Sequence, residues 1–158
     1  MKILLILILI LSCNVGFCQD MAKIRQIDDV VKSVNMNLLP TQRDSIIQDY
    51  PEMGLKIISY ISMIQNDKEL IKYENLVKTT RKENTEIRKM TTSSSFYYSN
   101  NKLIKVEEFS IEEDVKKTMD WYYSDGEPFF HTLKSDKAAD RAALLLKIAN
   151  GMLEKVIK

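Results

Sequence analysis

Apolar side chains recur at helical spacing near both ends of the chain and alternate with polar side chains between them. Asp20 can cap a helix, and the apolar positions after it predict a helix from about 21 to 36. These positions are Ile24, Ile27, Val31, Val34 and Leu38. A second amphipathic helix is predicted after Ser135 or Asp136, with Lys155 near its C-terminal end. Its apolar stripe comprises Ala138, Ala142, Leu145, Ala149, Met152 and Val156.

The middle of the chain has the two-residue period and the β-branched and aromatic residues of strands. The predicted strands are 55–63, 70–81, 85–98, 102–109, 118–123 and 128–133. A short helix is predicted over 42–49, because Thr41 and Asp44 have the spacing of a capping box. Pro51 ends this helix, since the residue before a proline disfavours helical backbone angles.

Two turn signals with similar flanking sequences mark the centre of the predicted sheet. Residues 96–102 and 121–127 both read aromatic-Tyr-Tyr-Ser-Asx, and in each segment the Asx residue opens a hairpin turn. The predicted fold is therefore α+β. It is a two-layer domain with an antiparallel meander of about six strands. The N-terminal and C-terminal helices pack on one face, and the other face is left more polar.

The first 18 residues have the pattern of a cleaved secretory signal peptide. Lys2 precedes an apolar run that ends at Leu11, and small residues precede a cut before Gln19. The run is shorter than the ~20 residues of a membrane-spanning helix. We expect residues 19–158 to form a single domain that is exported to the periplasm or secreted.

Part of the same segment supports a second route of processing. Ile10-Leu11-Ser12-Cys13 resembles the bacterial lipobox, which implies acylation of Cys13 and a membrane-anchored lipoprotein. The segment is similar in style to the signals of exported Gram-negative proteins. We expect a membrane tether only if Cys13 is lipidated.

The predicted mature chain is neutral and contains no thiol. Lys2 is the only charged residue among the first 18, so 22 basic and 22 acidic side chains remain after cleavage. A neutral, interspersed pattern gives no support for nucleic-acid binding. Both cysteines precede Gln19, so the domain must be held by its core. About 140 residues suffice for such a core.

Few residues offer catalytic or cofactor chemistry. His131 is the single histidine, and there are only four glycines, so zinc sites, catalytic triads and phosphate-binding loops have little support. We predict no catalytic, cofactor-binding or metal-binding residue. Carboxylates leave a hydrolase of the glycosidase type as an alternative, since such enzymes need only two. The candidates are Glu107, Glu108, Asp114 and Asp120.

The aromatic residues of the central hairpins provide the candidate binding site. If Tyr97 and Tyr122 lie exposed on the open face, they form a stacking platform for a sugar ring or a peptide, and Trp121 is a third candidate ligand residue. The alternative is that these rings stabilise the sheet through cross-strand pairs.

These patterns predict a small, non-catalytic binding or interaction protein of the bacterial cell envelope. Its partner would be a protein, a peptide or a glycan, and no cofactor is expected. Two alternatives remain open. One is an inhibitor or immunity-type protein that blocks an enzyme with a sheet edge or with the loop 110–117. The other is the carboxylate-dependent periplasmic hydrolase.

Overall fold

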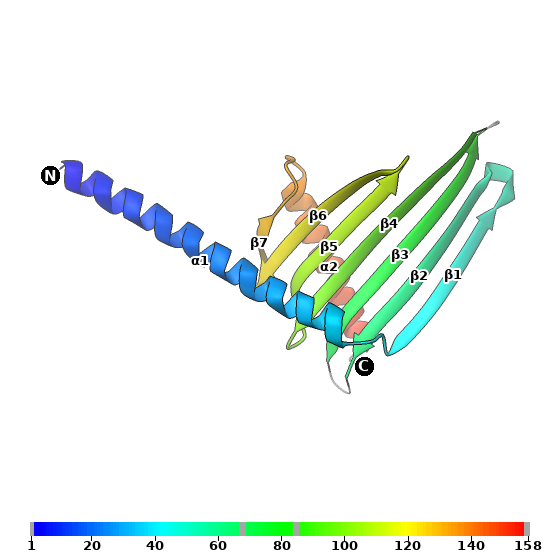
Figure 1. The fold of residues 1–158 in the computed structure, drawn as a ribbon, viewed down its shortest axis with the longest axis horizontal. Helices are drawn as coiled ribbons and strands as arrows, with labels where there is room; N and C mark the ends of the chain where they lie inside the picture. Colours follow the sequence, from blue (N-terminus) through cyan, green and yellow to red (C-terminus); the bar gives the residue numbers. More distant parts are fainter. Residues whose placement is uncertain (1, 67–68, 84–85, 157–158) are drawn as a thin grey trace.

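A computed structural model describes residues 2–66, 69–83 and 86–156, and shows one antiparallel sheet between two helices (Figure 1). The strands follow the chain in the order β1 to β7, as a meander. The α+β class and the meander with terminal helices are confirmed, with one strand more than expected. The elements are α1 (Lys2–Asn37), β1 (Gln42–Tyr50), the 3₁₀ turn η1 (Pro51–Met53), β2 (Leu55–Gln65), β3 (Leu70–Glu83), β4 (Glu86–Ser99), β5 (Lys102–Glu112), β6 (Val115–Ser124), β7 (Glu127–His131) and α2 (Ala138–Val156).

The segment predicted as a short helix, 42–49, is instead strand β1. It pairs with β2 over nine consecutive residues, from Gln42 opposite Met63 to Tyr50 opposite Leu55. The capping-box signal was outweighed by the long edge of β2, which offers every residue of β1 a cross-strand partner. This correction adds the seventh strand.

Three hairpins of the sheet turn through two residues with positive φ. They are Asn100-Asn101, Glu113-Asp114 and Asp125-Gly126, with φ between 48° and 84°. Positive φ at both central positions is the type I′ geometry, whose twist matches that of the flanking strands. The predicted loop 110–117 is therefore wrong, because strands β5 and β6 include all of it except Glu113 and Asp114.

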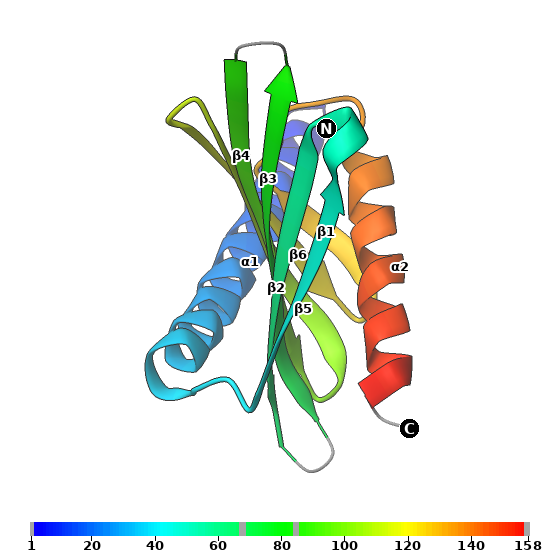
Figure 2. The same ribbon diagram turned by 90° about the vertical axis from the view of Figure 1, so that its right-hand side faces the viewer.

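The two helices lie on opposite faces of the sheet, so the prediction that they share one face is wrong (Figure 2). Phe96 and Tyr98 point toward α2, whereas Tyr97 between them points toward α1. Successive strand residues face opposite sides, so consecutive aromatic residues require a cover on both sides. The domain has three layers, α1, sheet and α2.

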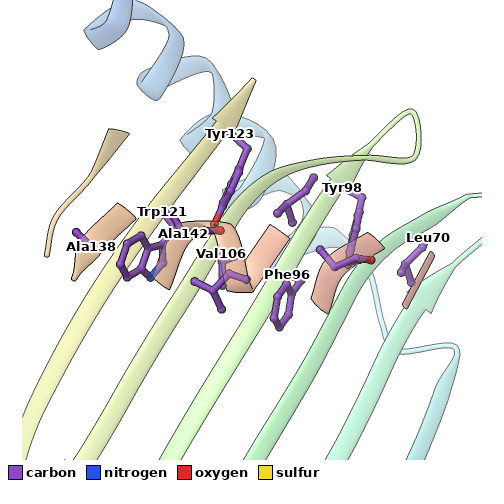
Figure 3. Packing of buried hydrophobic residues seen from close by; sticks show 11 residues of the cluster. Leu70, Phe96, Tyr98, Val106, Trp121, Tyr123, Ala138 and Ala142 are labelled. Carbon is purple, nitrogen blue, oxygen red and sulfur yellow. Dashed lines mark hydrogen bonds between the residues drawn. The ribbon is translucent and has the colours of Figure 1, made fainter. Parts of the chain in front are cut away.

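The larger core lies between α2 and the sheet (Figure 3). Small side chains on α2 let the helix approach β5 and β6 closely. The buried residues of this core are Leu70, Phe96, Tyr98, Leu103, Val106, Trp121, Tyr123, Ala138, Ala142, Leu145 and Ala149.

The second core lies between α1 and the other face of the sheet. Its buried members are Ile24, Ile27, Val31, Val34, Ile64, Tyr97 and Tyr122. The helical residues among them are four of the five in the stripe that predicted a helix over 21–36. The fifth, Leu38, lies just beyond α1 and is exposed. In the segments that the structure describes, no helix combines the length and apolarity needed to cross a membrane.

Candidate functional site

The three aromatic residues predicted to bind ligand are buried. Tyr97 and Tyr122 retain 2% and 4% of their surface beneath α1, and Trp121 retains none beneath α2. The prediction of an exposed aromatic platform is wrong, because α1 covers the sheet face that carries both tyrosines. The alternative interpretation, that these rings stabilise the sheet, fits the structure. The Tyr122 ring packs edge-to-face with Phe130 and Phe129, at centroid distances of 5.7 Å and 6.4 Å.

Between the two tyrosines, Lys105 forms the centre of a polar network under α1. Lys105 is paired with Tyr97 on one side and with Tyr122 on the other. Its Nζ donates hydrogen bonds to Asp28 Oδ1 at 2.8 Å and to Glu107 Oε1 at 2.9 Å. The Tyr122 hydroxyl donates to the same Asp28 oxygen at 2.9 Å. Side chains of β5 and β6 thus bind the same carboxylate of α1, that of Asp28.

A second set of contacts continues the network along α1. The Tyr97 hydroxyl donates to Glu107 Oε2 at 2.9 Å and accepts from Asn35 Nδ2 at 3.1 Å. The Asn35 Oδ1 in turn accepts from Lys72 Nζ at 3.1 Å. Lys72 also pairs with Glu74 at 3.0 Å. Asp28 and Asn35 therefore fasten α1 to the sheet at two points, two helical turns apart.

The environment of Lys105 keeps this side chain charged. Burial lowers the pKa of an ammonium, but here the hydrogen bonds to Asp28 and Glu107 and the charge on Glu107 outweigh it, so the pKa of Lys105 is raised. Burial raises the pKa of the nearby Asp120 carboxyl. Lys105 opposes this rise, while Glu107 and Asp28 reinforce it. A charged lysine with its donors occupied holds the helix in place and does not act as a nucleophile.

On the opposite face, Glu108 forms a separate buried cluster under α2. Its carboxylate accepts from Trp121 Nε1 at 2.9 Å, from Ser94 Oγ at 3.3 Å and from Arg141 Nε at 3.2 Å. A second nitrogen of Arg141 contacts the other carboxylate oxygen. This bidentate pair joins α2 to the middle of the sheet.

The four candidate carboxylates of the hydrolase interpretation do not converge. Glu107 and Glu108 face opposite helices, and Asp114 lies in the hairpin turn between β5 and β6. Only Glu107 and Asp120 are cross-strand partners, and both flank the Lys105 ammonium. In the described part of the chain, no group of three or more His, Cys, Asp and Glu residues is placed to hold a metal ion.

An open groove of about 730 Å³ lies between the C-terminal half of α2 and strands β1 to β3. Apolar side chains from both layers form its floor, namely Ile61, Met63, Tyr73, Ile148, Met152 and Val156. Polar residues surround the floor, namely Gln42, Asp44, Gln65, Lys147 and Lys155. Gly151 also lines the groove, and a Cβ added there would meet nothing within 4 Å.

The groove results from the way α2 crosses a twisted sheet. Ala142 and Ala149 are buried against the central strands, whereas the outer strands β1 and β2 lie across the groove from the C-terminal half of the helix. Tyr73 meets Phe96 edge-on at 6.2 Å and separates the groove from the closed core. A different hollow, of about 470 Å³ beside Met53, is lined by more charged residues, namely Arg81, Arg88, Lys89 and Glu112.

Sequence reasoning did not find the groove residues. Ile61, Met63 and Tyr73 were assigned to strands, and Met152 and Val156 to a helical stripe, all as ordinary core. Because β1 was predicted as a helix, β2 was expected to be the edge strand of the meander, with no strand on its outer side. The only available signal was Gly151, an apparent weak point within an amphipathic helix.

Comparison of the sequence with protein-family models and with curated proteins found no match, and comparison with solved structures found none.

Proposed function

We propose that the chain is a small, exported, non-catalytic binding protein of the bacterial cell envelope, with its ligand site in the groove between α2 and β1 to β3. The observation that carries the proposal is an open hollow whose apolar floor comes from two layers of the fold. Its volume of about 730 Å³ falls in the range of small-molecule sites, about 300–1,000 Å³.

The side chains around the groove fit an amphipathic ligand with an apolar chain and an acidic group. The floor offers aliphatic, thioether and aromatic contacts to the apolar part. Lys147 and Lys155 lie on the α2 side, and Asp44 is the one carboxylate on the β1 side. A ligand anion is therefore favoured near the helix and disfavoured near β1.

The export part of the proposal is supported by the signal-peptide pattern. Among the α1 side chains that the structure describes, from Asp20 onward, those buried against the sheet are Ile24, Ile27, Val31 and Val34, and cleavage before Gln19 retains them. The intact mass of the protein from its host tests this part. A mass matching residues 19–158 supports soluble export, and residues 13–158 with acyl chains support the lipoprotein alternative. The uncleaved mass would contradict both.

The ligand proposal is tested by titration calorimetry with dodecanoate below its micelle-forming concentration, and with dodecanol as the uncharged analogue. We expect dodecanoate to bind more tightly, because only it carries the anion. Gly151→Leu should weaken binding of both compounds by at least about tenfold, since the new side chain occupies the groove. The double variant Lys147→Glu/Lys155→Glu should weaken dodecanoate binding and leave dodecanol binding nearly unchanged.

The matched control is Ala143→Leu, an exposed position of α2 that does not line the groove. Both leucine variants should keep the melting temperature, because leucine is a good helix former and the added Cβ at Gly151 meets no neighbour. Absence of dodecanoate binding, or equal binding by wild type and Gly151→Leu, would refute the proposed site.

A further inference from the structure

We propose that β1 pairs with β1 of a second copy of this chain, so that two sheets join into one in a two-fold symmetric dimer. This inference goes beyond the ligand-binding proposal and does not depend on it. It rests on the edge position of β1, on its regular backbone and on the order of charges along it.

Strand β1 is a long, regular edge that lacks two of the features that protect edges, a proline and a β-bulge. It is first in the strand order, and all nine of its residues are exposed. Its register with β2 has no bulge, and the strand contains no proline. The other edge, β7, has five residues, includes Pro128 and has a register shift against β6. Of the two edges, β1 is the one able to add a strand.

The sequence of β1 is complementary to itself in one antiparallel register. Two-fold symmetry about Ile46 places Arg43 opposite Asp49 of the second copy, and Asp49 opposite its Arg43. In the same register Asp44 faces Gln48, and Gln42 faces Tyr50. All nine residues find a partner, and no two like charges are opposed.

Symmetric registers shifted by two residues lose this complementarity. Centring on Ser45 places Arg43 opposite Ile47, and centring on Ile47 places Asp49 opposite Ser45. Each shift also leaves two residues of the strand unpaired. The two Arg43–Asp49 pairs therefore select the register centred on Ile46.

The proposed pairing also covers apolar surface that the isolated chain exposes. Ile46 is 48% exposed and Ile47 is 63% exposed. In the dimer, the two Ile46 side chains meet on the α2 face at the symmetry axis. Ile47 packs beside Ser45 of the second copy on the α1 face. Arg43 and Asp49 make no ion pair within the described part of one chain, so both are available.

Symmetry then relates the two grooves. The axis runs perpendicular to the sheet, so both α2 helices lie on the same face of the joined sheet. Gln42 and Asp44 line the groove and belong to β1. The two grooves therefore flank the dimer interface.

Sedimentation velocity over a wide concentration range, with the chain from residue 19, tests the proposal. We expect a monomer–dimer equilibrium. Arg43→Asp and Asp49→Arg should each weaken the dimer by at least about tenfold, because each turns two ion pairs into two like-charge contacts. The double variant Arg43→Asp/Asp49→Arg restores both pairs with reversed polarity and should recover the dimer.

A mixture of the two single variants provides a sharper control. One chain then carries two aspartates at these positions and the other two arginines, so the heterodimer has both ion pairs, whereas each homodimer has none. We expect dimers to form on mixing, with the far-ultraviolet circular dichroism of each variant unchanged. A wild type that stays monomeric, or a dimer that the single variants do not weaken, would overturn the proposal.

Discussion

Replacing Lys105 with methionine tests whether the polar network under α1 determines stability. The Lys105 side chain is 6% exposed, and its ammonium lies within 4.0 Å of carboxylates that are 35% to 44% exposed. Methionine keeps most of the length of the lysine side chain and removes the cation. The carboxylates of Asp28, Glu107 and Asp120 then repel one another with no charge between them.

The size of the effect follows from the burial of the partners. Removing one member of a fully buried ion pair costs about 3–5 kcal/mol. Here water still reaches the carboxylates, which reduces the loss, so we expect about 2–3 kcal/mol. The matched control is Lys102→Met in the same strand. The Lys102 side chain is 63% exposed and 3.5 Å from an exposed Asp125, so its loss should stay below about 1 kcal/mol.

Urea unfolding followed by fluorescence of the buried Trp121 measures both variants. The pKa of Lys105 is higher in the folded state than in the unfolded state, where it is about 10.4. The stabilisation by Lys105 is therefore fully present below the unfolded-state pKa and is lost as the pH rises through the folded-state pKa. The difference between wild type and Lys105→Met should therefore persist from neutral pH to about pH 10 and shrink above it. Equal losses for Lys105→Met and Lys102→Met would refute the reasoning.

Three further substitutions have defined outcomes. Tyr97→Ala should lower the free energy of unfolding by about 3–5 kcal/mol in urea titrations, as for a large buried ring, and a negligible loss would contradict its burial. Asp120→Asn should stabilise the fold at pH 7, because burial raises the pKa of Asp120 and disfavours its anion. The gain should vanish below about pH 4, where the carboxyl is protonated in both states. Gly54→Ala should lower the melting temperature, because φ is +59° and the new Cβ would lie 2.6 Å from the Lys82 carbonyl oxygen. The control Gly151→Ala should not lower it, and equal melting temperatures for the two variants would refute the argument.

The strands and turns could be predicted because their signals are local. Alternation of side chains defined β2 to β7, and Asx residues marked two of the turns. Strand β1 was missed because its helical signal is also local, whereas its pairing with β2 is not. The third I′ turn, Glu113-Asp114, lacks the usual glycine or asparagine and was read as part of a loop.

The positions of the helices were predicted incorrectly although the sequence contained the signal. Residues 96–98 and 121–123 are each three consecutive aromatics. A strand with one face in water alternates apolar and polar residues, so three in a row indicate that both faces are covered. The groove had no comparable signal. It depends on where α2 and the twisted sheet diverge, which no short segment encodes.

The two buried charges of β5 explain how each helix finds its own face. Lys105 faces α1 and meets Asp28, whereas Glu108 faces α2 and meets Arg141. A helix docked on the wrong face would take Asp28 away from Lys105, which keeps Glu107, and would take Arg141 away from the buried Glu108. Removing the cation from a buried carboxylate is strongly destabilising. The apolar stripes of the helices alone do not distinguish the faces, since both faces carry aromatic residues. We infer that Lys105 and Glu108 assign the helices to their faces, and that Arg141 in this way also fixes the position of the helix that forms one side of the groove.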